Sequence, residues 1–170
     1  MNLTELATAE NELYAIVLQA HGTMEDKAIQ LRSKGVYDKY KQIHKWYADQ
    51  SENELESLKR GLFIQWYALS EPPCFTGINE LALEAERKII NQVNKLIASD
   101  SMDYELRWML KHYSTWDYVF ERFMDFKELQ EWIANKKGDE LPDTIDRSEM
   151  AKRGQTGRYW NSLINSSNKH

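Results

Sequence analysis

The stretch SENELESLKRGLFIQWYALS, residues 51–70, decides the fold class of this chain. Its apolar residues recur every three or four positions and form one broad stripe, made of Leu55, Leu58, Leu62, Phe63, Trp66 and Tyr67. Ile64 and Leu69 add apolar surface on another side of the same helix. Because such a helix is covered from more than one direction, the stretch predicts neighbouring helices on two sides. Ser51, followed three residues later by Glu54, predicts a capping box at its start.

The residues before this stretch predict two further helices, over about 3–20 and 24–47. Their starts are marked by two more capping boxes, formed by Asn2 with Glu5 and by Thr23 with Asp26. Gly22 is suited to end the first helix. Gly35 lies inside the second helix, where glycine costs about 1 kcal/mol relative to alanine, so a bend or a break is expected there.

Three more helices are expected after it, over about 80–98, 101–113 and 116–135. The expected start signals are Thr76 or Asn79 for the first of them, Ser101 for the second, and a capping box of Ser114 with Asp117 for the third. The third is expected to end around NKKG, residues 135–138, where lysines and a glycine suit a helix C-terminus.

The segment SEPPCFTGIN, residues 70–79, holds two of the three prolines and the sole cysteine of the chain. Proline disfavours helical geometry in the residue before it, so Pro72 and Pro73 predict a stiff corner between two helices. Cys74 is expected to pack in this corner as a small hydrophobic residue, with Phe75 as a plug beneath it. A reactive thiol is the alternative, and no local motif supports it.

After Gly138 the composition becomes polar, with a few apolar residues spread along it. We therefore expect a helical bundle domain over 1–138 and a C-terminal segment over 139–170, packed on the bundle or partly disordered. One short helix is expected near 144–152, and Tyr159 and Trp160 are expected to cover the bundle. Residues 165–170 are expected to be disordered.

Signals for β-strands are nearly absent, since no stretch alternates apolar and polar residues for long. The fold class is therefore all-α, a compact bundle of six to seven helices with short loops. A short stack of helical hairpins is the alternative, because helix pairs recur at a spacing seen in some helical solenoids.

Composition and charge narrow the classes of function. The chain has 170 residues, 22 basic and 27 acidic, with a net charge of −5, which argues mildly against a nucleic-acid partner. The first residues lack the basic and apolar regions of a secretory signal, and no apolar run reaches the length of a membrane span. A single cysteine excludes an intramolecular disulfide. These features predict a cytoplasmic protein with no membrane partner.

No local pattern indicates enzyme chemistry. The four histidines lack the spacing of a metal site, so no metal and no cofactor is expected. KRGQTGR, residues 152–158, lacks the order of a phosphate-binding loop, and a solvated turn is the preferred interpretation. The paired carboxylates are spaced as on solvated helix faces. Enzymatic activity is therefore uncertain, with the balance against it.

Nine of the twenty aromatic residues lie between 104 and 132. Burial between neighbouring helices is the preferred explanation, and an exposed aromatic patch rimmed by Arg107, Lys111 and Arg122 is the sharper one. The first functional hypothesis is accordingly a protein–protein interaction module, which binds a partner or itself. The candidate binding residues are Trp66, Tyr67, Glu71, Phe75, Arg87, Arg107, Trp108, His112, Tyr118 and Arg122.

Two alternatives stay open. One is a small-molecule binder or enzyme with an aromatic pocket between the helices over 55–70, 80–98 and 101–113. Its walls would come from Trp66, Tyr67, Phe75 and Trp108, with polar contacts from Glu71, Arg87 or His112. The other is nucleic-acid contact through basic residues of the C-terminal segment, namely Lys136, Lys137, Arg147, Lys152, Arg153 and Arg158.

Overall fold

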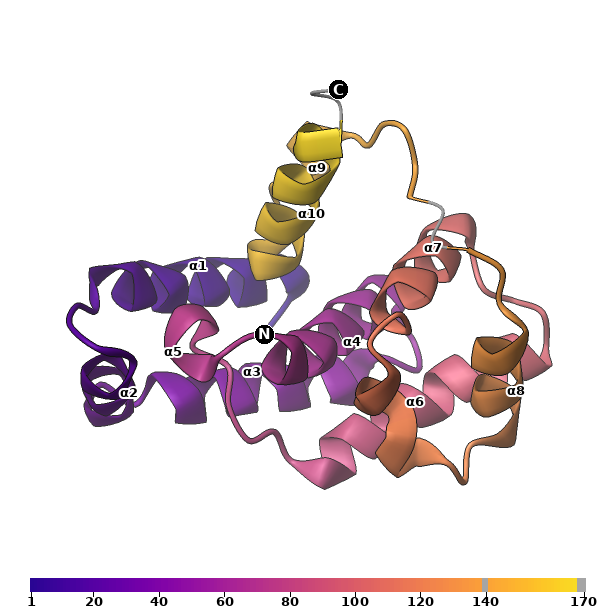
Figure 1. Ribbon diagram of the computed structural model, residues 1–170, viewed down its shortest axis with the longest axis horizontal. Helices are drawn as coiled ribbons and strands as arrows, with labels where there is room; N and C mark the ends of the chain where they lie inside the picture. The colour runs from indigo at the N-terminus through magenta and orange to yellow at the C-terminus, as the bar shows by residue number, and fades with distance from the viewer. Residues whose placement is uncertain (139–140, 168–170) are drawn as a thin grey trace.

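The computed structural model describes residues 1–138 and 141–167, with backbone only for 165–167, and within that range every regular element is a helix (Figure 1). The helices are α1 (Leu3–Gln19), α2 (Met24–Ser33), α3 (Val36–Gln50), α4 (Leu55–Ser70), α5 (Pro73–Thr76), α6 (Leu83–Ala98), α7 (Tyr104–Tyr113), the 3-10 helix η1 (Asp117–Phe123), α8 (Lys127–Asn135), α9 (Arg147–Met150) and α10 (Gly154–Ser167). The predicted all-α class is confirmed. The elements are shorter and more numerous than expected.

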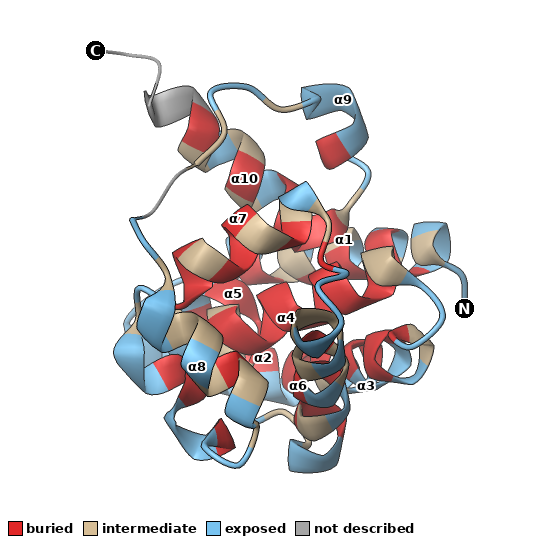
Figure 2. Cartoon of the chain, turned by 90° about the vertical axis from the view of Figure 1, so that its right-hand side faces the viewer, coloured by how far each residue is buried: buried red, intermediate tan, exposed pale blue. Residues whose placement is uncertain are grey.

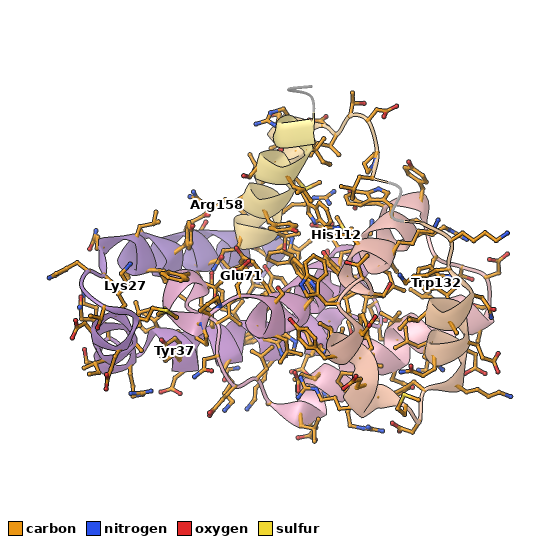
Figure 3. All side chains as sticks on the ribbon, viewed as in Figure 1. Lys27, Tyr37, Glu71, His112, Trp132 and Arg158 are labelled. Atoms are coloured by element: carbon orange, nitrogen blue, oxygen red, sulfur yellow. The ribbon has the colours of Figure 1, made fainter. Side chains whose placement is uncertain are left out.

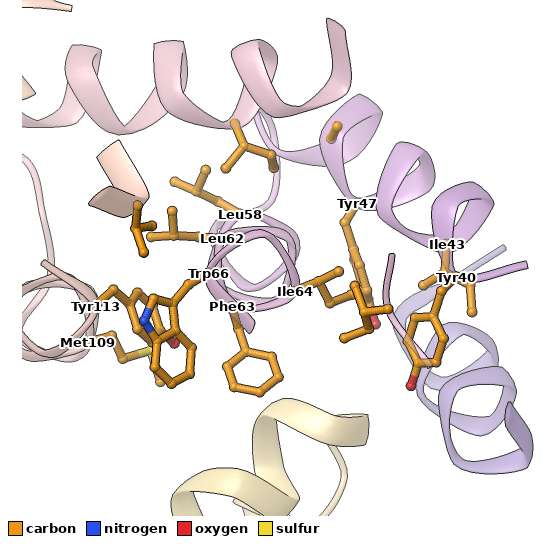
Figure 4. Close-up of a cluster of buried hydrophobic side chains, with 14 of the residues drawn as sticks. Tyr40, Ile43, Tyr47, Leu58, Leu62, Phe63, Ile64, Trp66, Met109 and Tyr113 are labelled. Atoms are coloured by element: carbon orange, nitrogen blue, oxygen red, sulfur yellow. The ribbon is translucent and has the colours of Figure 1, made fainter. Parts of the chain in front are cut away.

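Helix α4 lies in the middle of the bundle, and its residues 57–66 are all buried. Figure 2 shows buried residues gathered around it. In Figure 4, Ile64 points toward α3, Phe63 points toward α10, and Trp66 points toward Tyr113 of α7. The two-sided apolar pattern of residues 51–70 therefore predicted the position of this helix correctly, since α4 is covered on several sides.

Local capping signals at the start of the chain are confirmed. The Asn2 side chain accepts hydrogen bonds from the backbone of Thr4 and Glu5, and Glu5 accepts one from the Asn2 backbone. Thr23 forms the equivalent reciprocal bonds at the start of α2. Gly35 has a φ of 68°, which favours glycine, and it separates α2 from α3. The expected bend or break in this region is thus a break.

The capping box predicted for Ser51 and Glu54 is wrong. Because α3 continues to Gln50, Ser51 is its C-terminal cap with helical backbone angles, and its Oγ donates to the carbonyl of Ala48 at 2.8 Å. An N-cap needs an extended backbone, which Ser51 does not have. Helix α4 begins instead at Leu55, without a side-chain cap.

The start signals predicted for the later helices are also wrong. Thr76 accepts a bond from the Ile78 backbone, and α6 begins only at Leu83. Asp103, rather than Ser101, caps α7 by accepting from the backbone of Leu106 at 2.7 Å.

The single helix expected over 116–135 is divided into η1 and α8. Asn94, from α6, accepts a hydrogen bond from the Leu129 backbone at 2.8 Å and donates one to Glu128 at 2.9 Å. The first turn of α8 is therefore held by a residue more than thirty positions away in the chain. Phe126, just before it, has backbone angles outside the helical range.

The short helix expected near residues 144–152 is confirmed, and a second helix that was not expected follows it. Helix α9 is a single turn within that range, and the longer α10 follows it. The buried residues Trp160 and Ile164 of α10 belong to the same hydrophobic core as α1 and α4. The expected disorder of 165–170 does not hold for 165–167, whose backbone is helical, and 168–170 lie outside the described residues.

Over residues 1–138 and 141–167, no helix combines the length and the apolar character that crossing a membrane requires.

The packing of α10 on α9 gives a sharp test. A Cβ atom at Gly157 would lie 1.7 Å from the Met150 backbone oxygen, which real structures do not tolerate. Helix propensity alone predicts that Gly157→Ala stabilises the protein by about 1 kcal/mol. The contact predicts the opposite sign, a loss of about 2 kcal/mol or more, in the range of overpacked positions, as measured by urea unfolding.

Gly35→Ala is the matched control. No atom lies within 4 Å of a Cβ built at Gly35, so this substitution meets only the backbone strain of a positive φ. We expect a loss of about 1 kcal/mol for it. A Gly157→Ala protein as stable as the wild type would show that α10 does not pack against α9 in this way.

Candidate functional site

Aromatic rings fill the space between α4, α7 and α10. The Trp66 ring stacks on Tyr113 with ring centres 4.9 Å apart and meets Trp116 and Tyr159 edge-on at 5.1 Å. Trp108 packs against Trp160 of α10 at 4.6 Å. Each such pair adds about 0.5–1.5 kcal/mol beyond the area that it buries. The space around Trp66, where an aromatic pocket is predicted, is thus occupied by these rings.

His112 is part of this ring cluster. It is buried, and its Nε2 lies 2.7 Å from the hydroxyl of Tyr159. Its ring also packs against Trp66 and Trp160. The predicted candidates Trp66 and His112 are therefore brought together, as core residues in contact with α10.

A second group of buried polar side chains lies where α10 begins. Glu10, on α1, is fully buried and accepts a hydrogen bond from the Tyr47 hydroxyl at 2.6 Å and from the Gln155 backbone at 3.1 Å. A Cβ atom at Gly154 would lie 2.8 Å from the Glu10 carboxylate oxygens, so glycine permits this close approach. The Gln155 side chain donates to the Tyr40 hydroxyl and to the carbonyl of Thr76.

Burial raises the pKa of Glu10 to about 7. The hydrogen bonds from Tyr47 and Gln155 and the positive charge of Arg60 act in the opposite direction and lower it. A negative charge at the start of a helix is also favoured by the helix dipole. Glu10 therefore holds the first turn of α10 against α1 and α3.

A network of charged side chains holds Arg153, the residue just before α10. It consists of Glu56, Lys59, Arg60, Asp103, Glu105 and Arg153. Arg153 contacts Glu105 at 2.9 Å and Glu56 at 3.2 Å, while Lys59 reaches Glu105 at 2.7 Å. The Lys59 side chain is only 8% exposed, so these ion pairs are shielded from water and from salt more than surface pairs are.

Three tyrosines from α1, α4 and α10 lie near two charged residues, Arg158 of α10 and Glu71 just after α4, at the surface above the ring cluster. The Arg158 guanidinium lies 5.2 Å from the centre of the Tyr14 ring, and Tyr67 lies 5.7 Å from Tyr159. Burial raises the pKa of Tyr67 to about 12, with smaller contributions from nearby Glu71 and Tyr14. Figure 3 labels Glu71 and Arg158 near the junction of the three helices. We call these five residues, Tyr14, Tyr67, Glu71, Arg158 and Tyr159, the tyrosine surface.

The other predicted candidates lie elsewhere. Phe75 is 44% exposed with Lys27 above its ring, so it does not form the plug expected beneath the corner. Arg87 pairs with Asp125 and lies over Phe126. The hydroxyl of exposed Tyr118 donates to the Leu69 carbonyl at 3.2 Å.

Arg107 and Arg122 do not meet in one aromatic patch. Arg122, in η1, donates a hydrogen bond to the buried carboxylate of Glu86 on α6. Arg107 lies on α7, 3.8 Å from the exposed Asp100, and lines a groove with α6 and α8. The predicted rim of an exposed aromatic patch is therefore divided between two places.

Four of the six basic residues predicted for nucleic-acid contact, Arg147, Lys152, Arg153 and Arg158, form bonds within the protein. Arg153 belongs to the charged network, Lys152 pairs with Glu149 at 2.5 Å, and Arg147 donates to the carbonyl of Asn161. The KRGQTGR stretch is not a solvated turn, because Gly154 begins a helix and residues 154–157 are buried.

In the part of the chain that the structure describes, no group of three histidine, cysteine or acidic side chains is placed to hold a metal ion. Comparisons of the chain with protein-family models, with curated proteins and with solved structures found no match.

Replacing Glu10 by glutamine should change how stability depends on pH. The folded-state pKa of about 7 is above the ordinary value of 4.5, so the protonated form stabilises the fold below pH 4.5. That contribution is lost as pH rises through 7, up to about 3 kcal/mol at about 1.4 kcal/mol per pKa unit. In urea titrations, the free energy of unfolding of the wild type minus that of Glu10→Gln should fall as the pH rises from 4.5 to 7.

His44 acts in the opposite direction and makes the difference measurement necessary. Burial lowers the pKa of His44 to about 4 from 6.5, so its contribution is present above pH 6.5 and is lost as pH falls through 4. Between pH 4.5 and 6.5 the slopes from His44 and Glu10 oppose each other. A difference curve that is flat from pH 4.5 to 8 would contradict the placement of Glu10.

Cys74 lies in the corner as predicted, in the single turn of α5, and is 4% exposed. A thiol reagent should therefore label Cys74 slowly in buffer, at a rate set by local opening, and rapidly in urea. Complete labelling within the mixing time under native conditions would indicate an accessible thiol and contradict this placement.

Proposed function

We propose that this protein is a non-enzymatic protein-binding module and that its partner docks on the tyrosine surface. The observation that supports this is the meeting of Tyr14, Tyr67 and Tyr159 with Arg158 at one junction of three helices. Tyrosine, tryptophan and arginine dominate the residues that contribute most energy to protein interfaces.

The aromatic rings beneath the tyrosine surface hold Tyr67 and Tyr159 in place, which favours the binding of a partner. Tyr67 packs on Phe63 at 4.9 Å and on Trp66 at 5.7 Å, and Tyr159 packs on both of them. Because these rings are held by buried neighbours, Tyr67 and Tyr159 lose little conformational freedom when a partner binds. Leu18, one helical turn after Tyr14 and 66% exposed, extends the surface with apolar area.

The charges favour a protein partner over nucleic acid. Arg158 is the sole cation of the five residues, and Glu71 adds a carboxylate that would repel phosphate. The chain as a whole carries a net charge of −5. We keep the cytoplasm as the expected compartment, because the single cysteine gives no disulfide framework of the kind that small secreted domains use.

Affinity capture from native lysate with four forms of the protein tests the proposal. Wild type and Tyr104→Ala should retain the same partner, while Arg158→Glu and Tyr67→Ala should lose it. For the purified partner, we expect each of the two surface variants to weaken binding about thirtyfold, the effect of losing about 2 kcal/mol at a hot spot. Light scattering of the protein alone shows whether that partner is a second copy.

Tyr104 is the matched control because it is a tyrosine, 70% exposed, that begins α7 away from the tyrosine surface. Arg158 is exposed, so its substitution separates loss of binding from loss of folding, which thermal unfolding of each variant checks. Identical sets of captured proteins from all four forms, or a strict monomer that retains nothing, would refute the proposal.

A further inference from the structure

A groove of about 460 Å³ lies between α6, α7 and α8, at the end of the molecule where Figure 3 labels Trp132. This volume is in the range of small-molecule sites, about 300–1,000 Å³. Ile97 and Ala98 of α6 form one wall. Arg107 and Lys111, one turn apart on α7, form the opposite wall.

Helix α8 and the residue that follows it supply the rest of the lining, including the Trp132 indole on the helix and Lys136 just after its end. Trp132 is partly exposed and packs against the core, so one part of its ring is fixed and another faces the groove. The indole and Ile97 offer a flat apolar contact. A planar ring system is the ligand shape that such a surface favours.

The charges around the groove are unevenly paired. Among the described residues, no carboxylate lies within ion-pair distance of Lys111 or Lys136, and Arg107 has only Asp100 at 3.8 Å, which is 94% exposed. Lys111 and Lys136, with Arg107, therefore offer positive charge to the groove.

Two carboxylates also line the groove, and both have other partners. Glu128 accepts a hydrogen bond from Asn94, which lowers the pKa of that carboxyl, and Glu131 pairs with Lys127 at 3.7 Å. Because Lys127 lies outside the lining, three cations in the groove face two carboxylates that are already engaged. The balance at the groove is positive although the whole chain is negative.

We propose that the groove between α6, α7 and α8 binds a small aromatic anion, with the ring on Trp132 and Ile97 and the acid group at Arg107 and Lys111. A carboxylate and a phosphate ester share this chemistry, and direct measurement distinguishes them. This site is separate from the tyrosine surface and does not depend on the protein-binding function.

Titrations followed by proton–nitrogen NMR test the proposal on the intact protein. The probes are 1-naphthoate, 1-naphthyl phosphate and the neutral 1-naphthamide, and the reporter is the indole N–H signal of Trp132, identified with Trp132→Phe. At least one anion should shift this signal saturably, and the amide should bind about tenfold more weakly or not at all. The anion that binds more tightly identifies the acid group.

Variants locate the charge contribution. Arg107→Gln and Lys111→Gln should each weaken anion binding about threefold, as expected for partly exposed charge pairs. Lys95→Gln is the matched control, because Lys95 is exposed on α6, pairs with Glu52 and does not line the groove. Both variant positions are partly exposed at the surface of α7, so the fold should persist, which the NMR spectrum itself reports.

Three results would overturn the proposal. The first is the absence of a saturable shift at Trp132 with either anion. The second is equal affinity for 1-naphthamide, which would remove the electrostatic argument. The third is a loss with Lys95→Gln as large as with Lys111→Gln, which would show general attraction to positive charge rather than a site.

Discussion

The buried carboxylate of Glu10 accepts a hydrogen bond from the first turn of α10, and the candidate protein-binding surface depends on this contact. The Gln155 backbone and the Tyr47 hydroxyl both donate to that carboxylate, and Gly154 allows the chain to come close. Removing a carboxylate from water is costly, as the raised pKa of about 7 records. The bonds to Tyr47 and Gln155 offset that cost and fix where α10 begins, because a displaced helix would leave a buried carboxylate without donors.

From its first turn at Glu10, α10 extends across α4 and completes both the hydrophobic core and the tyrosine surface. Trp160 enters the core beside Trp108, and Tyr159 covers Trp66 and contacts His112. The same turn of helix places Arg158 over Tyr14 on the outside. The core and the tyrosine surface are thus built by successive residues of one helix, whereas the groove of α6, α7 and α8 is formed without α10.

The helices and helix starts that the sequence predicts correctly are those determined by local patterns of residues. The apolar stripe of residues 55–67 located α4, and the reciprocal caps at Asn2 and Thr23 located two helix starts. Asn94, which caps α8 from another helix, has no local signal in the sequence. Helix α10 has none either, because it contains glycine and asparagine, and tertiary contacts stabilise it against its weak helix propensity.

One signal was present but missed: Glu10 lies four residues after Leu6 and three before Leu13, inside the buried stripe of α1, where a carboxylate needs hydrogen-bond donors. Of the tyrosine surface, the sequence analysis named Tyr67 and Glu71 as binding candidates, Arg158 only for nucleic-acid contact and Tyr159 only as a cover of the bundle. Tyr14 had no signal, since its contact with Arg158 depends on the position of α10.

Hydrogen exchange of the Gln155 backbone amide is the most direct test of this account. The amide is buried and donates to Glu10 at 3.1 Å, so its exchange should be slowed to the level of the α4 core amides, with protection lost only on global unfolding. Exchange of this amide at the rate of an unstructured peptide, while α4 stays protected, would show that α10 is not held on Glu10 and would remove the basis of the surface that it completes.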